Sequence, residues 1–343
     1  MKVLLFQVDG KRTPNLALMR LSAWHKAKGD EVVLLRSIQD LWFTEGIDRA
    51  YASSIFTASK ARREEFAKRF PNAITGGDGY KPIWDLHIIG KDIGSKLSEV
   101  IKDTDPNTII PDYSIYPYFQ DSIGYSQRGC RLDCGFCRMK TREGDPRSVS
   151  TLREIWRGKP YPKHVYLLDN DFFGQNEWHA RLDEAVNWSF KVCFNQGINI
   201  RLINETQARV LSRVFYCDDQ FKVRRLYTAW DNLGDERVFK AGVELLKSAG
   251  IPPRHLMVYM LVGFRANETM EEIMYRFNEL KALGCRPYPM VFNKYLEIDP
   301  ERFYELKKFQ AWVVRRYYEF VPWKEFGEWR EPTSGIVQED LAL

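Results

Sequence analysis

Six apolar segments alternate with segments of helical spacing between Ser122 and residue 293. The intervening segments carry apolar residues at positions i, i+4 and i+7, as at Trp178, Leu182 and Ala185. Strands that alternate with helices pack as a parallel sheet covered by those helices. Six strand–helix units are more than one half of a doubly wound sheet contains, and fewer than the eight of a closed barrel. A curved, incomplete barrel is therefore predicted. The candidate strands read SIGYS, HVYLLDN, VCFNQGINIR, VRRLYTAWD, HLMVYMLVGF and RPYPMVFN.

Residues 1 to about 110 follow the same alternation in shorter form. Apolar runs KVLLF, EVVLLR, SSIFT and NAITGG are separated by helical stretches over Pro14–Lys28 and residues 59–70. This pattern predicts an open parallel α/β domain. The following stretch, KDTDPNTIIPDYSIYPYF, is rich in Pro and Asp and is interpreted as a linker. We therefore expect domains at 1–110 and 111–295, with a helical, aromatic-rich extension at 296–343.

The chain has 343 residues, which is enough for two domains with large cores. Its N-terminus lacks the apolar run and cleavage site of a signal peptide, and no run approaches ~18 uncharged apolar residues. We expect a cytoplasmic protein without a membrane span. In that compartment six cysteines do not indicate a disulfide scaffold, and three of them, Cys193, Cys217 and Cys285, are interpreted as buried core thiols.

The other three cysteines form a cluster at Cys130, Cys134 and Cys137. We expect the first strand of the second series to end at Gly129, which places the cluster where parallel barrels carry their chemistry. A structural zinc site takes four protein ligands, and the nearest histidine in the sequence is the distant His164. Iron–sulfur clusters also usually have four cysteines, so three would leave one iron open. Three structural thiols are the alternative.

The segment CRLDCGFC resembles the C-x3-C-x-aromatic-C signature of the radical S-adenosylmethionine superfamily, with Phe136 at the aromatic place. The resemblance implies a partial (β/α)6 barrel and a [4Fe–4S] cluster held by the three cysteines. It also implies that S-adenosylmethionine chelates the fourth iron and is cleaved reductively to methionine and a 5′-deoxyadenosyl radical. A flavodoxin- or ferredoxin-like electron donor is implied as a partner.

The same resemblance implies cofactor contacts at the ends of the later strands. They are Asp169, Asn170 and Asp171 in LLDNDFFG, Asn195, Gln196 and Arg201 in FNQGINIR, Trp230 and Asp231 in YTAWDN, and Val262 and Gly263 in MLVGF. Arg201 could pair with the cofactor carboxylate through both guanidinium nitrogens. For each polar residue the alternative is a hydrogen bond within the protein that serves only the fold.

The N-terminal domain resembles the cobalamin-binding-like domain that precedes the barrel in some radical enzymes. That likeness implies that Ser54, Gly76 and Gly77 lie near a corrinoid tail. A D-x-H-x-x-G string occurs at Asp85–Gly90, but it comes late in the domain, whereas the loop QVDGKRTPN after the first strand has no histidine. We interpret the string as coincidental. Cobalamin binding without a histidine ligand, or no cobalamin binding, are both left open.

Charge and aromatic content suggest the substrate. Between Arg128 and Lys163 there are ten lysines and arginines against four acidic residues, which would attract an anionic ligand unless they form a solvated face. The aromatic and basic stretch from Phe309 to Arg330 could stack on bases, although packing against the barrel is favoured. The first hypothesis is therefore a radical enzyme acting on an anionic small molecule, such as a nucleotide, or on a base in nucleic acid. A cobalamin-dependent radical methyltransferase and a non-catalytic iron–sulfur module are the alternatives.

Overall fold

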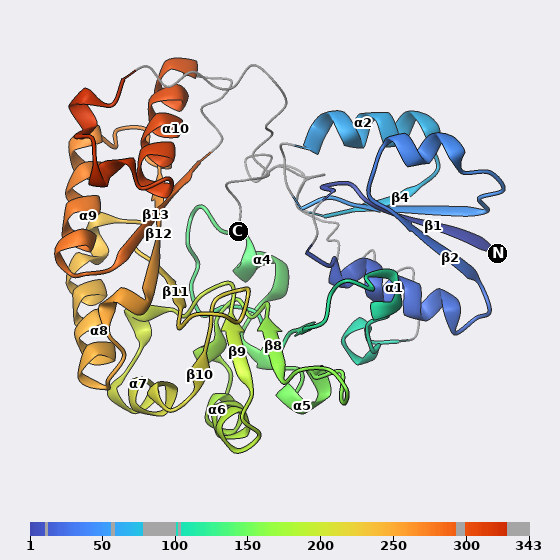
Figure 1. Ribbon diagram of the computed structural model, residues 1–343, viewed down its shortest axis with the longest axis horizontal. Helices are drawn as coiled ribbons and strands as arrows, with labels where there is room; N and C mark the ends of the chain where they lie inside the picture. The colour runs from blue at the N-terminus through green and yellow to red at the C-terminus, as the bar shows by residue number, and fades with distance from the viewer. Residues whose placement is uncertain (11–12, 56–58, 78–100, 102–103, 293–298, 328–343) are drawn as a thin grey trace. The chain divides into compact units, whose positions relative to one another are not determined.

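The computed structural model describes residues 1–10, 13–55, 59–77, 101, 104–292 and 299–327. It divides into two compact units, Met1–Gln120 and Asp121–Leu343, each of which is described here by itself (Figure 1). Both units combine helices with parallel sheets, as expected for an α/β protein. The D-x-H-x-x-G string at Asp85–Gly90 lies outside the described residues.

The first unit is built on one parallel sheet with the strand order β2-β1-β3-β4. Alternate residues of β1 face opposite sides, so Val3 packs with helix α1 and Leu4 packs with helix α2. Figure 1 shows these helices on opposite faces of the sheet. The elements are β1 (Lys2–Gln7), α1 (Leu16–Lys26), β2 (Glu31–Leu35), β3 (Arg49–Ser53), α2 (Lys60–Arg69) and β4 (Ile74–Gly76).

The expected linker packs onto the first unit, which therefore ends after Gln120 and not after residue 110. Tyr116 is fully buried, and its hydroxyl donates to the Gln7 side-chain oxygen at 2.9 Å. Ser22 of α1 donates to the Asp112 carboxylate at 2.6 Å. Composition indicated a linker because Pro and Asp break regular structure. Short 3₁₀ turns, at Pro106–Thr108 and Tyr113–Ile115, nevertheless let the tyrosines reach the core.

The second unit contains two parallel sheets with the strand orders β10-β9-β8-β5 and β11-β12-β13. The backbone N–H of Ile198, just beyond β9, donates to the carbonyl of Tyr227 in β11 at 2.8 Å and so joins the two sheets. The strands are β5 (Ser122–Gly124), β8 (His164–Leu167), β9 (Lys191–Phe194), β10 (Phe215–Tyr216), β11 (Leu226–Ala229), β12 (Leu256–Val262) and β13 (Arg286–Val291).

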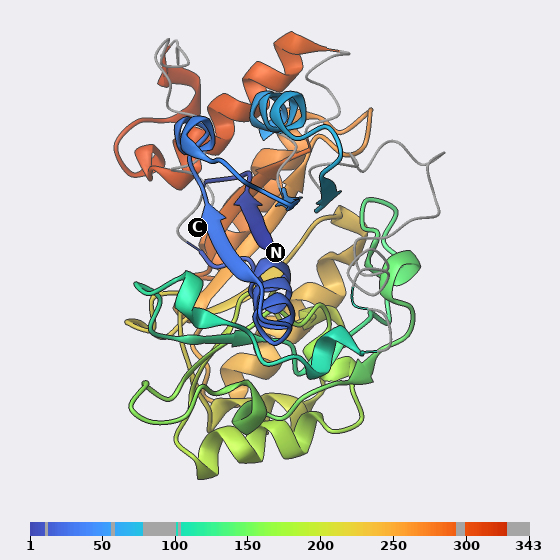
Figure 2. The same cartoon turned by 90° about the vertical axis from the view of Figure 1, so that its right-hand side faces the viewer.

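Helices cover one side of these strands and enclose the main core (Figures 1 and 2). Along β12, alternate residues Val258, Met260 and Val262 are fully buried against them. The longer helices are α6 (Trp178–Asn187), α7 (Glu205–Ser212), α8 (Glu236–Ser248), α9 (Met270–Ala282) and α10 (Pro300–Val314). Shorter elements are β6 (Gln127–Arg128), α4 (Met139–Glu143), β7 (Arg147–Ser148) and α5 (Leu152–Ile155).

The aromatic residues near the C-terminus belong to the same core. Phe309 and Trp312 of α10 are buried in it, and Trp323 and Phe326 pack against it from outside. This confirms the packing interpretation for these four residues, whereas Phe320 is exposed. The segment 299–327 is thus part of the second unit and not a separate extension. Within the described residues, no helix is long and apolar enough to cross a bilayer.

Candidate functional site

The cysteine loop, defined here as residues 129–138, connects β6 to α4 in the second unit. Its three thiols are half-buried. Burial raises the pKa of Cys130, and the neighbouring Asp171, Cys137 and Cys134 raise it further. The backbone N–H of Leu132 points at the Cys130 sulfur, 3.4 Å away.

The strand before the loop is shorter than the sequence suggested. β5 ends at Gly124 and not at Gly129, and the chain then makes the short antiparallel pair of β6 with β7. The change of direction occurs at Ser126, where the buried carboxylate of Asp169 accepts backbone N–H bonds from Ser126 at 2.7 Å and Gln127 at 3.0 Å. The Ser126 hydroxyl donates to the second carboxylate oxygen. Asp169 therefore replaces the sheet partner that this backbone lacks.

A second carboxylate holds the loop itself. Asp171 is almost fully buried and forms a bidentate ion pair with Arg131, at 2.7 and 2.8 Å. It also accepts the backbone N–H of Arg131 at 3.1 Å, next to Cys130. Paired contacts of this kind fix orientation as well as position. The resemblance implied that Asp171 contacts the cofactor. In the structure, both of its carboxylate oxygens bind Arg131 of the cysteine loop.

A third carboxylate, Glu143 at the end of α4, closes the base of the loop. It pairs with Arg128 through both oxygens, at 2.7 and 2.9 Å, and accepts the N–H of Gly129 at 3.0 Å. The side-chain amide of Asn170 donates to the same carboxylate at 2.9 Å. Glu143 was not among the predicted site residues. No pattern in the sequence shows which acidic residue folds back onto Gly129.

Gln127 is a further residue that the sequence did not indicate. Its buried side-chain amide donates to the carbonyls of Arg128 and Gly129 at 2.7 and 2.8 Å, and its oxygen accepts the N–H of Asp171 at 3.0 Å. Irregular backbone in a buried place needs such partners, because unpaired N–H and C=O groups are costly there. Together with the three carboxylates, Gln127 makes the entry to the cysteine loop rigid.

Two predicted residues come close to the loop from other strands. Arg201, after β9, points a guanidinium nitrogen at the Cys134 sulfur, 3.6 Å away, and pairs with Asp235 at 2.8 Å. The ring of Phe136 packs edge-on against Phe264, which follows β12, with centroids 5.4 Å apart. Phe264 in turn contacts Phe292 after β13 at 5.1 Å. The loop thus contacts residues that follow β9 and β12.

Asn195 and Gln196 follow β9 directly. Asn195 is half-buried, and Gln196 is exposed. Within the described part of the chain, neither side-chain amide has a hydrogen-bond partner, so both are available to a ligand.

The predicted contacts on β11 and β12 have structural partners. Trp230 is fully buried, stacks on Phe239 at 5.0 Å and donates its indole N–H to the Asn232 carbonyl. Its side chain is therefore core material. Asp231 accepts the N–H of Leu261 at 2.9 Å, which ties β11 to β12. Burial raises the pKa of Asp231.

Val262 and Gly263 end β12 in a conformation set by one buried ion pair. Gly263 has φ +80°, and its N–H donates to Glu268 at 2.7 Å. Glu268 pairs with Arg276 of α9 at 2.5 Å, and Arg276 donates to the carbonyls of Trp230 and Leu261, both at 3.0 Å. The pair therefore fixes the ends of β11 and β12 together.

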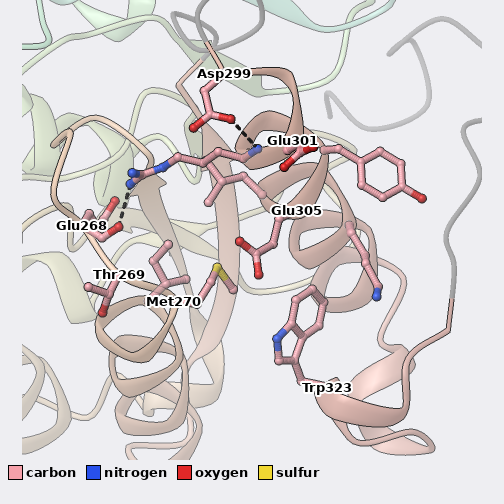
Figure 3. Close-up of a pocket in the computed structure, with 12 residues that line it drawn as sticks. Glu268, Thr269, Met270, Asp299, Glu301, Glu305 and Trp323 are labelled. Carbon is pink, nitrogen blue, oxygen red and sulfur yellow. Dashed lines mark hydrogen bonds between the residues drawn. The ribbon is translucent and has the colours of Figure 1, made fainter.

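A pocket of about 600 Å³ lies between the start of α9 and α10, beside the segment that joins β12 to α9 (Figure 3). Figure 3 labels Asp299 and Glu268, each of which has a hydrogen bond drawn as a dashed line. Arg302 donates both bonds, and its guanidinium also donates to the carbonyls of Arg265 and Ala266. Its lining includes no residue of the cysteine loop. Asp299 caps α10 by accepting the N–H of Arg302 at 3.0 Å. These groups serve the packing of the helices.

The predicted corrinoid-side residues lie at the carboxyl ends of β3 and β4 in the first unit. Gly77 has φ +106°, and a Cβ there would lie 1.7 Å from the Ser54 carbonyl oxygen. Ser54 itself donates its N–H to Gly76 at 2.9 Å and its fully buried hydroxyl to Asp9 at 3.1 Å. Asp9 also accepts the N–H of Ile55 at 2.6 Å. The carboxyl ends of β3 and β4 are therefore in direct contact with each other.

Part of the local basic excess is paired within the chain. Arg128 pairs with Glu143, Arg131 with Asp171, and Lys140 with Asp145. Arg153 and Arg157 lie over the rings of Trp188 and Tyr161, respectively. Three of the ten basic residues are thus ion-paired within the chain, so the excess is smaller than a count of charges suggests.

Replacing Gly129 by alanine is expected to disrupt the cysteine loop. Gly129 has φ +85°, and a Cβ there would lie 2.2 Å from the carbonyl oxygen of Asp145. Proteolysis near the loop should increase severalfold. Gly135→Ala is the matched control, because its Cβ would meet only Phe264, at 3.7 Å. Equal rates of proteolysis in the two variants would contradict this account of Gly129.

Asp169 should make stability depend on pH. Burial raises the pKa of Asp169 to about 7, well above that of an aspartate in the unfolded chain, so the folded chain holds a proton that the unfolded chain releases between these values. The free energy of unfolding should therefore fall by up to about 1.4 kcal/mol per pH unit as pH rises through this window. Asp169→Asn, which keeps the shape, should flatten this slope. Identical urea unfolding curves across pH for both proteins would count against it.

Comparison of the chain with family models, with curated proteins and with solved structures finds no match in any of the three.

Proposed function

We propose that the chain is a radical S-adenosylmethionine enzyme whose cluster is held by Cys130, Cys134 and Cys137. The observation that carries this proposal is the cysteine loop itself: three half-buried thiols within eight residues, on a backbone fixed by Asp169, Asp171 and Glu143. Three structural thiols would not require such a rigid, half-exposed loop, because free cysteines with only a packing role are usually buried.

The residues present fit an iron–sulfur cluster. The donor set is three thiols, and sulfur ligands suit iron–sulfur centres. N–H groups point at two of the sulfurs, from Leu132 and Arg201, and hydrogen bonds of this kind stabilise thiolate ligands. When bound with S-adenosylmethionine, the cluster would supply the electron that cleaves the sulfonium C–S bond, giving methionine and the 5′-deoxyadenosyl radical.

The two sheets of the second unit would form the partial (β/α)6 barrel. We take β5, β8, β9, β11, β12 and β13 as its six strands, because they run parallel and Ile198 links β9 to β11. Their carboxyl ends then lie at one edge, as in other parallel barrels. The contacts of the cysteine loop with Arg201 and Phe264 support this arrangement.

Residues around the loop would orient S-adenosylmethionine and exclude water. The amides of Asn195 and Gln196 would bind its polar groups, since neither has a partner among the described residues. Phe136 and Phe264 would shield the sulfurs from solvent with their packed rings. Trp230 and Asp231 would act only by fixing the backbone of β11.

Cobalamin does not fit the residues predicted for it. The hydroxyl of Ser54 is buried and bonded to Asp9, and Gly77 lies directly against the Ser54 backbone. The function we propose therefore includes no corrinoid step, and the methyltransferase alternative has no support from these residues.

The test is anaerobic reconstitution with iron and sulfide, followed by addition of S-adenosylmethionine and a strong chemical reductant. 5′-deoxyadenosine should form in amounts that exceed the protein-free control. S-adenosylhomocysteine formed beside it would favour the methyltransferase. Visible iron–sulfur absorbance without either product would favour the non-catalytic module instead.

A further inference from the structure

Basic residues stand at the amino ends of the parallel strands in the second unit. Two of them are the first residues of β9 and β13, and the others come one or two places before β8, β11 and β12. Parallel strands of one sheet begin at the same edge, so these residues lie at the end opposite to the carboxyl ends. We call this set the basic rim and define it by Lys163, Lys191, Arg224, Arg225, Arg254 and Arg286.

Contacts join the rim across the starts of β8, β9 and β10. Lys191 lies in register with His164 of β8 and with Phe215 of β10. Phe221, in the turn after β10, stacks on His164 with centroids 4.4 Å apart, and its carbonyl accepts a bond from the Lys191 ammonium at 3.5 Å. The guanidinium of Arg224 lies over the Phe215 ring, 4.3 Å from its centroid. This part of the rim therefore reaches the beginning of β11.

The rest of the rim continues across β11, β12 and β13. The Arg225 guanidinium donates to the carbonyl of Arg254 at 3.3 Å. Arg286 lies in register with Met257, the second residue of β12. Burial lowers the pKa of His255, just before β12, and the neighbouring arginines lower it further, Arg254 most of all. The six cations thus form one continuous strip along the strand starts.

The charge of the rim is not compensated within the described residues. None of the six forms an ion pair with a carboxylate there. Asp121, Asp218 and Asp219 lie at the same end of the strands. Asp121 pairs with His164 at 2.8 Å, Asp218 accepts the backbone N–H of Lys222 at 2.8 Å, and burial raises the pKa of Asp219. The rim cations therefore outnumber these carboxylates and would attract an anionic partner.

Two exposed aromatic rings lie among the cations. Phe215 is 45% exposed, and the Lys191 ammonium is 5.3 Å from its ring centroid. Trp188, shortly before β9, is 37% exposed, and Lys163 donates to its carbonyl at 2.9 Å and lies 5.6 Å from its ring. Proteins that bind single strands combine a basic groove for the phosphates with aromatic rings on which the bases stack.

We propose that the basic rim binds single-stranded nucleic acid, with phosphates on the cations and unpaired bases on Phe215 and Trp188. The bases of a duplex are already stacked on one another, so a duplex would use the cations alone. The inference goes beyond the proposed function and does not depend on it. The cysteine loop contacts residues that follow β9 and β12, so the cluster would lie at the other end of these strands.

Fluorescence anisotropy of the full chain with a labelled, mixed-sequence RNA strand of about 16 nucleotides tests the proposal. Contact of about four cations with phosphates gives a slope of about −3 for log affinity against log salt, so affinity should fall about fiftyfold between about 50 and about 200 mM salt. The single strand should also bind about tenfold more tightly than a duplex of the same sequence, which cannot stack on the rings.

Three variants separate the rim from general stickiness. Arg254 and Arg286 are exposed, and within the described residues their side chains have no hydrogen-bond partner. Arg254→Gln combined with Arg286→Gln should weaken binding about tenfold and reduce the salt slope by about 1.4. Phe215→Leu should weaken binding severalfold and leave the slope unchanged, because it removes stacking and no charge. Arg315→Gln combined with Lys324→Gln removes two exposed cations near the C-terminus and should bind like the wild type.

Several results would overturn the inference: no saturable binding at about 50 mM salt, equal losses in the two double variants, or equal affinity for single strand and duplex. Dextran sulfate carries charge without bases, so binding as tight as that of the RNA would also overturn it. Cys130→Ala should bind the RNA like the wild type. Formation of 5′-deoxyadenosine without RNA binding would remove this inference alone, and RNA binding without that product would remove the proposed function alone.

Discussion

Cys130→Ala is expected to abolish both 5′-deoxyadenosine formation and the visible iron–sulfur absorbance of the reconstituted protein. The cluster would have three protein ligands, so losing one leaves only two to hold it. The remaining thiols cannot compensate from elsewhere, because Cys193 and Cys217 are fully buried in other strands. Product should therefore fall to the level of the protein-free control, measured by chromatography, and bound iron should fall with it.

Cys285→Ala is the matched control. Cys285 is also a free thiol, but it is 6% exposed and packs in the main core beside the helices. Its replacement should cost some stability through the cavity that it leaves, and iron content and product should stay at the level of the wild type. If Cys130→Ala kept its absorbance and product, the assignment of the cluster ligands would be refuted.

The sequence was sufficient to locate most of the parallel strands. Apolar runs located β1, β2, β8, β9, β11, β12 and β13, because a parallel strand covered by helices must be apolar. α7 was missed, although Asn204 and Gln207 form a capping box that could have marked its start. Two-residue strands such as β10 are too short to leave a periodic signal.

The partners of the candidate site residues could not be read from the sequence. The resemblance implied cofactor contacts after the second strand of the barrel, at Asp169, Asn170 and Asp171. Their side chains instead bond to Ser126, Glu143 and Arg131, respectively. Such pairs join residues far apart in the chain, and a carboxylate that binds a ligand looks the same in sequence as one that binds a backbone N–H. The spacing of the cysteines, by contrast, is local and was readable.

The same distinction explains the arginines. A count of charges showed an excess between Arg128 and Lys163, but it could not show which charges are neutralised by Asp171, which lies outside that stretch.

Glu268→Ala is expected to lower the free energy of unfolding by about 3–5 kcal/mol, because it leaves the buried charge of Arg276 without a partner. Arg276 is fully buried, and Glu268 is its ion-pair partner at 2.5 Å (the carboxylate also receives the Gly263 N–H). Loss of the carboxylate therefore affects the ends of both β11 and β12. Urea unfolding followed by circular dichroism measures the change.

Glu279→Ala on α9, the helix of Arg276, is the control for loss of an acidic residue. Glu279 pairs with Lys240 at 2.6 Å, and both side chains are about one-third exposed, so the cost should stay below about 1 kcal/mol.

Adding Arg276→Met to Glu268→Ala removes the unpaired charge and should recover part of the stability. Because the pair holds the strand ends that contact Phe136 through Phe264, Glu268→Ala should also lower iron incorporation. Equal destabilisation by Glu268→Ala and Glu279→Ala would show that the buried pair does not fix these strand ends.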